Sequence, residues 1–221
     1  MPQTLFTARS GGVSSREFTS FNLALHVGDL AAHVMTNRDL LASALSQRQP
    51  IYMNQVHGNL AIEVSSANSK AITADAIFTS EVGLPLVVLS ADCLPILISA
   101  KGAVAAIHAG REGLINGVIS NCIQGMRAIG AIDFEAQIGP AICANCYEVD
   151  MQMYLELTDR FPNLATEGSR HALNLRAEAL AQLKELGVKV SIIDICTAES
   201  ENHFSYRRDG KTGRGAGVIA L

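Results

Sequence analysis

The long apolar stretch at residues 82–109 constrains the fold of this chain more than any other feature of its sequence. Asp92, two prolines and Lys101 interrupt the stretch, so it does not have the continuous apolar length of a helix that crosses a membrane. Short apolar runs bounded by Gly, Pro, Asn and Ser are typical of buried strands. We therefore expect residues 82–109 to form several buried strands.

The rest of the chain alternates strand-like and helix-like segments irregularly. Strand patterns occur in "TLFTARSGGVS", which ends in a Gly-Gly turn, and in "IYMNQV", "LAIEVSS", "DAIFTS", "AQIGPAIC" and "KVSIIDICT". Helical spacing occurs at residues 29–45 and 113–130 and in "EVDMQMYLELTDRF" and "LRAEALAQLKELGV". Residues 203–221 are interpreted as a hairpin whose turn is 209–213. This order predicts an α+β fold or a layered α/β fold with mixed sheets.

The composition favours one globular domain and excludes some partners. With 221 residues, of which 48% are hydrophobic and 17% charged, the chain is long enough for one sizeable core over residues 1–221. A net charge of -4 argues against nucleic acid as a partner. The first residues lack the basic start and apolar region of a signal peptide, so the five cysteines are expected to be free thiols in a reducing cytoplasm.

Three residues have the context of a functional site: His57, Cys93 and His108. Each is predicted at a strand end, beside Gly, Asp or Pro. Two imidazoles and a thiolate can hold Zn²⁺ and leave a fourth position for water. Alternatively, Cys93 is a nucleophile and a histidine is its base. Asp92, within an apolar run, needs a partner, and orienting an imidazole would satisfy it.

The remaining polar motifs are weaker signals. Residues 143–146, "CANC", fit Cys-x-x-Cys once only, which is weak evidence for a zinc or redox site. Cys122 and Cys196 are interpreted as core residues. The cationic segment around Arg207 and Arg208 is either a solvated turn or an anion clamp. Neither the Gly-rich dinucleotide fingerprint nor the phosphate-binding loop motif is present.

Several segments in one order resemble a known family. They are "NQVHG", "SADCLPIL", "HAG-x-x-GL", "IGPAI…CYEV" and "FSYRRDGKTGR", preceded by "GGVS…FNLALHVGD…NR". Together they resemble the purine nucleoside phosphorylase family also named polyphenol oxidase or laccase-domain protein, some of whose members are labelled peptidoglycan-editing factors. The resemblance runs from about Thr7 to the C-terminus. It implies a single-domain layered α/β fold, an α/β/β/α sandwich with mixed sheets, and a metal site at His57, Cys93 and His108.

The resemblance also implies an activity, a cofactor and partners. The activity is phosphorolysis of adenosine, inosine and S-methyl-5′-thioadenosine together with adenosine deamination, so the protein is expected to be both a transferase and a hydrolase. Zn²⁺ is the expected metal and Cu²⁺ the alternative. Purine nucleosides and phosphate are the expected partners, without nucleic acid or membrane, for a cytoplasmic monomer or small homo-oligomer. Candidate phosphate-binding residues are Asn22, Arg38, Arg207 and Arg208.

Three other functions stay open. They are a copper-dependent polyphenol oxidase, a Cys-based amidase acting in peptidoglycan editing, and a binding module without activity. The sequence departs from the family pattern at two places. Where the family usually has His-Ala-Gly-Trp-Arg-Gly, this chain has Arg111 in place of Trp and Glu112 in place of Arg. The family also tends to have Gly at the position of Ala24. These replacements bear on specificity if the usual aromatic or cationic residue holds substrate.

Overall fold

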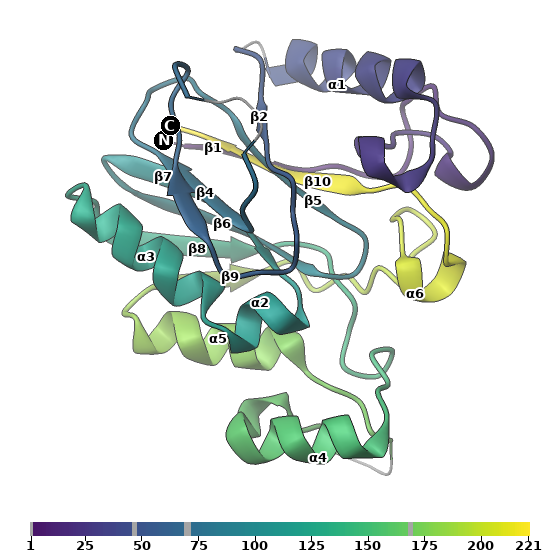
Figure 1. The fold of residues 1–221 in the computed structure, drawn as a ribbon, viewed down its shortest axis with the longest axis vertical. Helices are drawn as coiled ribbons and strands as arrows, with labels where there is room; N and C mark the ends of the chain where they lie inside the picture. The colour runs from purple at the N-terminus through teal and green to yellow at the C-terminus, as the bar shows by residue number, and fades with distance from the viewer. Residues whose placement is uncertain (1, 46–47, 69–71, 168–169) are drawn as a thin grey trace.

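The protein folds into four stacked layers (Figure 1). The computed structural model describes residues 2–45, 48–68, 72–167 and 170–221. Helix α1 covers a four-stranded sheet on one side, and helices α3 and α5 cover a six-stranded sheet on the other. The two sheets pack face to face between these helices, as expected for two apolar surfaces that must leave water.

The four-stranded sheet has the order β1-β10-β5-β2. Its strands are β1 (Gln3–Phe6), β10 (Gly215–Ala220), β5 (Leu86–Ser90) and β2 (Ile51–Tyr52). Strand β10 lies antiparallel between β1 and β5, and β2 runs parallel to β5. The first and last strands of the chain are therefore hydrogen-bonded neighbours.

The six-stranded sheet has the order β3-β4-β7-β6-β8-β9. Its strands are β3 (Ala61–Glu63), β4 (Ala76–Thr79), β7 (Ala103–Ala109), β6 (Leu94–Lys101), β8 (Ile132–Ile138) and β9 (Lys189–Ile192). The outer pairs β3/β4 and β8/β9 are parallel, and the pairs between them are antiparallel. Strand β7 is buried along its whole length, as its apolar sequence predicts.

The helices lie outside the sheets. They are α1 (Ala31–Leu45), α2 (Arg111–Ile115), α3 (Val118–Ala128), α4 (Met151–Arg160), α5 (Leu175–Glu185) and the short α6 (Tyr206–Asp209), with 3₁₀ turns at Arg16–Phe18, Leu25–Val27 and Pro162–Leu164. Among the described residues, no helix is long and apolar enough to cross a membrane.

Three groups of buried side chains confirm the predicted layers. One joins the six-stranded sheet to α3 and α5 through residues such as Ile107 and Ile123. A second lies between the sheets, where Ile77 and Leu97 face Leu86. A third joins the four-stranded sheet to α1. The mixed α/β architecture with two mixed sheets is as predicted.

Two predicted elements were wrong. The helix expected at residues 113–130 is two helices, because Gly117 adopts a left-handed φ of 86° between α2 and α3. The hairpin expected at residues 203–221 does not form. Its first half contains the short helix α6 and no strand, and β10 pairs with β1 and β5, which are distant in sequence. Local turn residues do not reveal such long-range pairing.

The segment "SADCLPIL" bends at its polar pair instead of continuing as one strand. Ser90 ends β5 in one sheet and Leu94 begins β6 in the other, so residues 91–93 carry the chain between the sheets. Asp92 has a left-handed φ of 100°, which is strained for a residue with a side chain. The acid and the thiol therefore lie in a tight turn at the junction of the sheets.

The packing between the sheets gives a first prediction. Ile77 is fully buried in that layer, so Ile77→Ala is expected to lower the free energy of unfolding by about 3 kcal/mol, from lost apolar burial and the cavity left behind. Urea denaturation measures the change. Val82→Ala is the control, because Val82 is 70% exposed and its truncation is expected to change stability by less than about 0.5 kcal/mol. Equal losses in both variants would contradict the assignment of the core.

Candidate metal centre and its cavity

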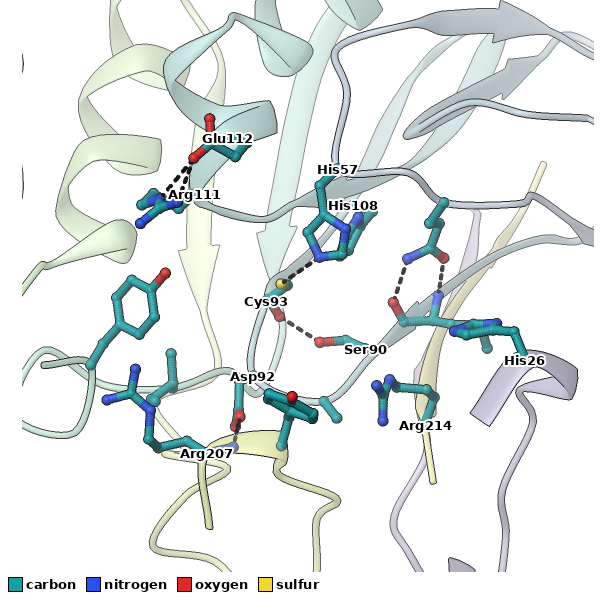
Figure 2. Close-up of a pocket in the computed structure, with 16 residues that line it drawn as sticks. His26, His57, Ser90, Asp92, Cys93, His108, Arg111, Glu112, Arg207 and Arg214 are labelled. Atoms are coloured by element: carbon teal, nitrogen blue, oxygen red, sulfur yellow. Dashed lines mark hydrogen bonds and ion pairs between the residues drawn. The ribbon is translucent and has the colours of Figure 1, made fainter. Parts of the chain in front are cut away.

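The structure brings His57, Cys93 and His108 together from three separate segments (Figure 2). His57 lies in the loop after β2 with a left-handed φ of 60°, not at the strand end that was predicted. Cys93 lies in the β5–β6 turn, and His108 lies in β7. The Cys93 Sγ atom is 3.8 Å from His57 Nε2, and the potential ligand atoms of all three residues lie within 4.8 Å of one another.

A single carboxylate organises both histidines. Asp75, just before β4, is fully buried and accepts a 2.7 Å hydrogen bond from His108 Nδ1. It also accepts from the backbone N–H groups of the loop that presents His57. These are Val56 at 3.2 Å, His57 at 2.9 Å and Gly58 at 2.7 Å. Because its Nδ1 bonds Asp75, His108 offers Nε2 to the centre, as carboxylates behind metal-binding histidines commonly arrange.

The electrostatics favour an ionised thiol at the centre. Burial raises the pKa of Cys93, but the charges and hydrogen bonds of His108 and His57 together outweigh burial and lower the pKa to about 6. Burial lowers the pKa of His108, but Cys93 and Asp75 together raise it above its usual value. Burial also raises the pKa of Asp75, yet hydrogen bonds from His108 and Gly58 bring it below the ordinary range. A thiolate is the form of cysteine that binds metals and attacks electrophiles.

The donor set fits a metal ion. Two imidazole nitrogens and a thiolate are good ligands for Zn²⁺ or copper, and three protein ligands leave a position open on the cavity side. The backbone makes room for this set at Gly110. A Cβ atom there would lie 2.9 Å from His57 Cδ2 and 3.1 Å from Cys93 Sγ. The chain thus needs glycine where it passes behind the ligands.

The centre opens into a cavity of about 460 Å³, a size typical of small-molecule sites. Apolar and aromatic side chains line part of the wall, and cationic groups line the rest. The lining residues are His26, Gln55, His57, Leu89, Ser90, Ala91, Asp92, Cys93, His108, Arg111, Glu112, Ile142, Tyr147, Tyr206, Arg207 and Arg214.

Three guanidinium groups reach the cavity. Arg207 donates to the carbonyl of Cys146 at 3.0 Å and lies over the Tyr147 ring at 5.2 Å. Arg214 donates to the backbone carbonyls of Thr212 and Gly213. Arg111 bonds its neighbour Glu112, with 3.1 Å between Nε and Oε1. Arg111 and Glu112, which stand where the resembling family usually has Trp-Arg, therefore pair with each other at the cavity wall.

Other candidate phosphate-binding residues lie away from the cavity. Asn22 is fully buried and its amide bonds the backbone of Ala24 and the carboxylate of Asp29. Arg38 donates to the carbonyl of Leu23 and lies 3.7 Å above the Tyr52 ring. Both therefore support the packing of the N-terminal loop and α1.

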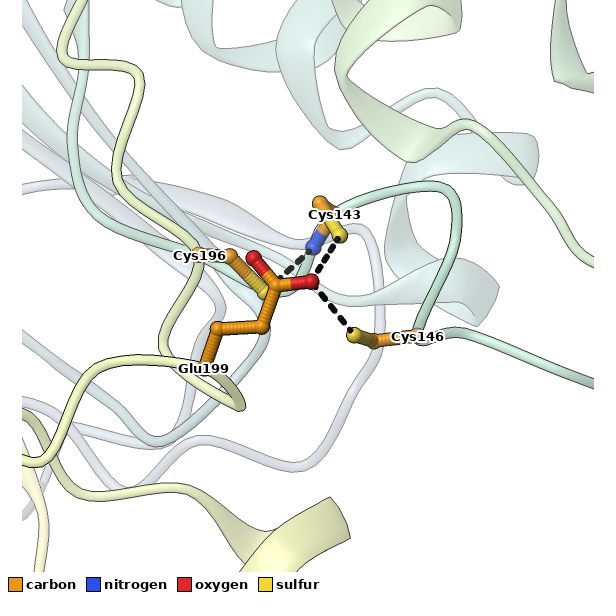
Figure 3. A group of neighbouring side chains, drawn as sticks. All are labelled: Cys143, Cys146, Cys196 and Glu199. Atoms are coloured by element: carbon orange, nitrogen blue, oxygen red, sulfur yellow. Dashed lines mark hydrogen bonds between the residues drawn. The ribbon is translucent and has the colours of Figure 1, made fainter.

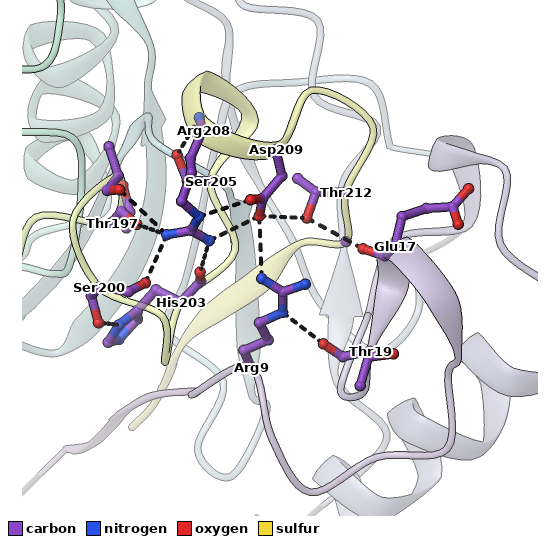
Figure 4. Close-up of polar contacts among 12 residues, drawn as sticks. Arg9, Glu17, Thr19, Thr197, Ser200, His203, Ser205, Arg208, Asp209 and Thr212 are labelled. Carbon is purple, nitrogen blue, oxygen red and sulfur yellow. Dashed lines mark hydrogen bonds and ion pairs between the residues drawn. The ribbon is translucent and has the colours of Figure 1, made fainter.

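The guanidinium of Arg208 also makes structural contacts and does not line the cavity (Figure 4). Its guanidinium donates to the carbonyls of Thr197, Ser200 and His203 and pairs with Asp209. Asp209 in turn pairs with Arg9. Arg208 thus ties the loop after β9 to α6, while its neighbour Arg207 faces the cavity.

Asp92 does not orient an imidazole, although the sequence suggested that role. The Asp92 carboxylate accepts from Thr197 Oγ1 at 2.6 Å and from the Arg207 backbone N–H at 2.7 Å, so its partners are not imidazoles. The acid that orients an imidazole is Asp75, which sequence reasoning missed although it also sits beside an apolar strand. His26 also lies on the cavity wall.

Comparison with known proteins identifies the family. The model of the family described as multi-copper polyphenol oxidoreductase laccase matches residues 3–221, and the chain belongs to this family. A Corynebacterium glutamicum protein named purine nucleoside phosphorylase is 41% identical over 98% of this chain and 93% of that protein. One of the same name from Streptomyces coelicolor is 40% identical over 98% of this chain and 94% of its own. The crystal structure of a Neisseria meningitidis protein superposes with a TM-score of 0.90 at 36% identity, covering all of this chain and 94% of the other.

The role of Asp75 is testable by replacing it with its amide. Asp75→Asn keeps the shape but loses the charge that holds His108, so the affinity for Zn²⁺ is expected to fall about 10- to 100-fold. Competition with a chromogenic chelator measures this affinity. Asp133→Asn is the matched control, because Asp133 is exposed and pairs with Lys101 on the surface. An unchanged affinity in a folded Asp75→Asn protein would contradict the role of this carboxylate.

The close approach at Gly110 gives another prediction. Gly110→Ala places a methyl group against both His57 and Cys93, so the two ligands must separate, and zinc affinity is expected to fall at least about tenfold. Isothermal titration with Zn²⁺ checks this. Gly102→Ala is the control: its new methyl group meets no atom within 4 Å, but its φ of +90° strains any residue other than glycine, so it shows the effect of a destabilising loss of glycine outside the cavity. Equal affinities in the two variants would show that the contact at Gly110 is unimportant.

Proposed function

We propose that the protein is a zinc-dependent purine nucleoside phosphorylase that also deaminates adenosine. Its proposed substrates are adenosine, inosine and S-methyl-5′-thioadenosine. The observation that carries the proposal is the convergence of a His₂Cys donor set, cationic side chains and aromatic rings on one cavity. The names of the related proteins from Corynebacterium and Streptomyces support the same reaction class.

The arginines supply a binding site for phosphate. Arg207 and Arg214 each lie near a tyrosine ring, at 5.2 Å from Tyr147 and 5.9 Å from Tyr206. Guanidinium groups hold phosphate through paired charge-assisted hydrogen bonds. Arg111 adds a third cation, partly neutralised by Glu112. We therefore keep Arg207 from the predicted phosphate-binding residues and add Arg214, while Asn22, Arg38 and Arg208 have structural contacts instead.

Aromatic and apolar side chains supply a site for the purine base. Tyr206 is 62% exposed although it lines the cavity, so the face of its ring that Arg214 does not cover can stack on a planar ligand. Burial raises the pKa of Tyr147, so its phenol stays protonated near neutral pH and can donate a hydrogen bond. Leu89 and Ile142 complete an apolar wall. A base bound here lies beside the metal ligands.

In phosphorolysis, a phosphate oxygen bonds to C1′ of the ribose while the bond from C1′ to N9 of the base breaks. The base leaves with the bonding electrons and takes up a proton, and ribose 1-phosphate is the second product. The arginines hold the attacking anion in position for this displacement. A metal ion at His57, Cys93 and His108 supplies Lewis-acid chemistry and a coordinated water of lowered pKa when bound. Deamination releases ammonia from the purine ring and consumes one water.

Phosphate-dependent release of base tests the proposal. Inosine with phosphate is expected to give hypoxanthine and ribose 1-phosphate in equal amounts, measured by chromatography. Arg207→Gln and Arg214→Gln are expected to raise the KM for phosphate about 10- to 100-fold, because each loses charge-assisted hydrogen bonds. Arg160→Gln, an exposed arginine at the end of α4, is the control.

The outcomes separate this function from its rivals. Base release that needs no phosphate, or arginine variants that behave like Arg160→Gln, would contradict phosphorolysis. Activity that survives complete zinc removal but is lost in Cys93→Ser would instead indicate Cys93 as a nucleophile with a histidine base, as in a Cys-based amidase.

Copper-dependent oxidation of phenols is the second candidate. The family description names such an activity, and His₂Cys is a ligand set of copper proteins. The whole chain has only six histidines, however, which is few for a centre with several copper ions. An intense visible thiolate-to-copper band, with phenol turnover faster than nucleoside turnover, would favour this function over the first.

A further inference from the structure

A second group of metal-binding side chains lies apart from the cavity lining (Figure 3). Cys143 and Cys146 belong to the loop between β8 and α4, and Cys196 and Glu199 belong to the segment between β9 and α6. Cys196, predicted as a core residue, instead faces the Cys-x-x-Cys pair. The three cysteines are free and only partly buried, so an ion can reach them from solvent.

The spacing of the donor atoms suits a tetrahedral ion. The three sulfurs and a carboxylate oxygen lie within 4.8 Å of one another. A Zn²⁺ ion with ordinary bond lengths sets neighbouring sulfurs about 3.8 Å apart and a sulfur and an oxygen about 3.6 Å apart. Glu199 Oε1 lies 3.4 Å from Cys146 Sγ and 3.9 Å from Cys143 Sγ, which brackets that value. Small side-chain shifts suffice to close the cluster on an ion.

The backbone around the cluster is held in place before any ion binds. Cys196 pairs with Ala141 in a parallel bridge, and the Cys143 N–H donates to Cys196 Sγ at 3.3 Å. Arg176 on α5, which is largely buried, donates to the Ala141 carbonyl at 2.6 Å and also to the Ile195 carbonyl. The two cysteine-bearing segments are therefore fixed side by side, which lowers the cost of ordering the ligands.

We propose that Cys143, Cys146, Cys196 and Glu199 form a second metal site that takes one structural Zn²⁺ ion. Thiolates are soft ligands that favour zinc over the hard cations of the cell. Four protein ligands complete a tetrahedral shell without an open position, which is the arrangement of structural sites and not of catalytic ones. The site shares no ligand with the His57, Cys93 and His108 centre, so it does not depend on the proposed function.

An ion at this site cross-links two segments that build the cavity. In the first segment, the cavity residues Ile142 and Tyr147 lie directly before Cys143 and directly after Cys146. The second carries Thr197, whose hydroxyl holds the Asp92 carboxylate in the β5–β6 turn. The carbonyl of Cys146 also accepts from Arg207 on the cavity wall. The structural ion therefore stabilises the wall that faces the first centre.

The number of zinc ions per chain in the purified protein, measured by elemental mass spectrometry, tests the site. Wild-type protein prepared under reducing conditions without chelator is expected to hold about two zinc ions per chain, because each centre has its own complete set of ligands. Cys146→Ser and Cys93→Ser are each expected to lower this to about one, and the double variant to near zero. Glu201→Gln, two residues from Glu199 but outside the cluster, is the control and keeps both ions. The melting temperature of Cys146→Ser is expected to be several degrees below that of the control.

Two results would overturn the second site. One is a single zinc ion in the wild type that Cys93→Ser alone removes. The other is an intact mass showing a disulfide among Cys143, Cys146 and Cys196 in protein kept reduced. If Cys146→Ser does not fold, zinc-edge anomalous scattering from wild-type crystals decides instead. Two peaks, one amid the three cysteines, support the site, and a single peak at His57 refutes it.

Discussion

The candidate active site depends on the hydrogen bonds that the buried carboxylate of Asp75 accepts. Its oxygens accept one imidazole N–H and three backbone N–H groups, so its charge is compensated although it is fully buried. Removing this carboxylate would leave the N–H groups that donate to it without acceptors, which costs free energy in a protein interior. Through these hydrogen bonds, Asp75 fixes both the conformation of the loop that presents His57 and the orientation of His108 in β7.

The junction between the two sheets places Cys93, the third candidate ligand. The chain leaves the four-stranded sheet at Ser90 and enters the six-stranded sheet at Leu94, and Cys93 projects from the turn between them. The strained conformation of Asp92 persists because Thr197 and the backbone of Arg207 hold its carboxylate. Those partners come from the C-terminal quarter of the chain, so the turn also draws the arginine-bearing segment toward the cavity. The candidate ligand Cys93 and the cationic wall are thereby positioned by one set of contacts.

Much of the architecture could be predicted from local sequence patterns, and much of the site could not. Strands β4 to β7 were recognisable because apolar runs alternate with Pro and Gly, and Cys122 was correctly placed in the core. The pairing of β10 with β1 and β5, and the meeting of Cys196 with Cys143, depend on topology that no local pattern encodes. Asp75 was overlooked for the same reason, since its partners come from segments that only the fold brings near. Arg207 and Arg208 are adjacent in sequence, yet only the structure shows that they face different surroundings.

We propose that His57, Cys93 and His108 bind one metal ion together. X-ray absorption at the zinc edge tests it most directly, using protein in which Cys143 and Cys146 are both replaced by serine and one equivalent of Zn²⁺ is added. We predict two imidazole nitrogens at about 2.0–2.1 Å and one sulfur at about 2.3 Å from the ion. A spectrum without a sulfur at that distance, or without the scattering of imidazole rings, would contradict the account.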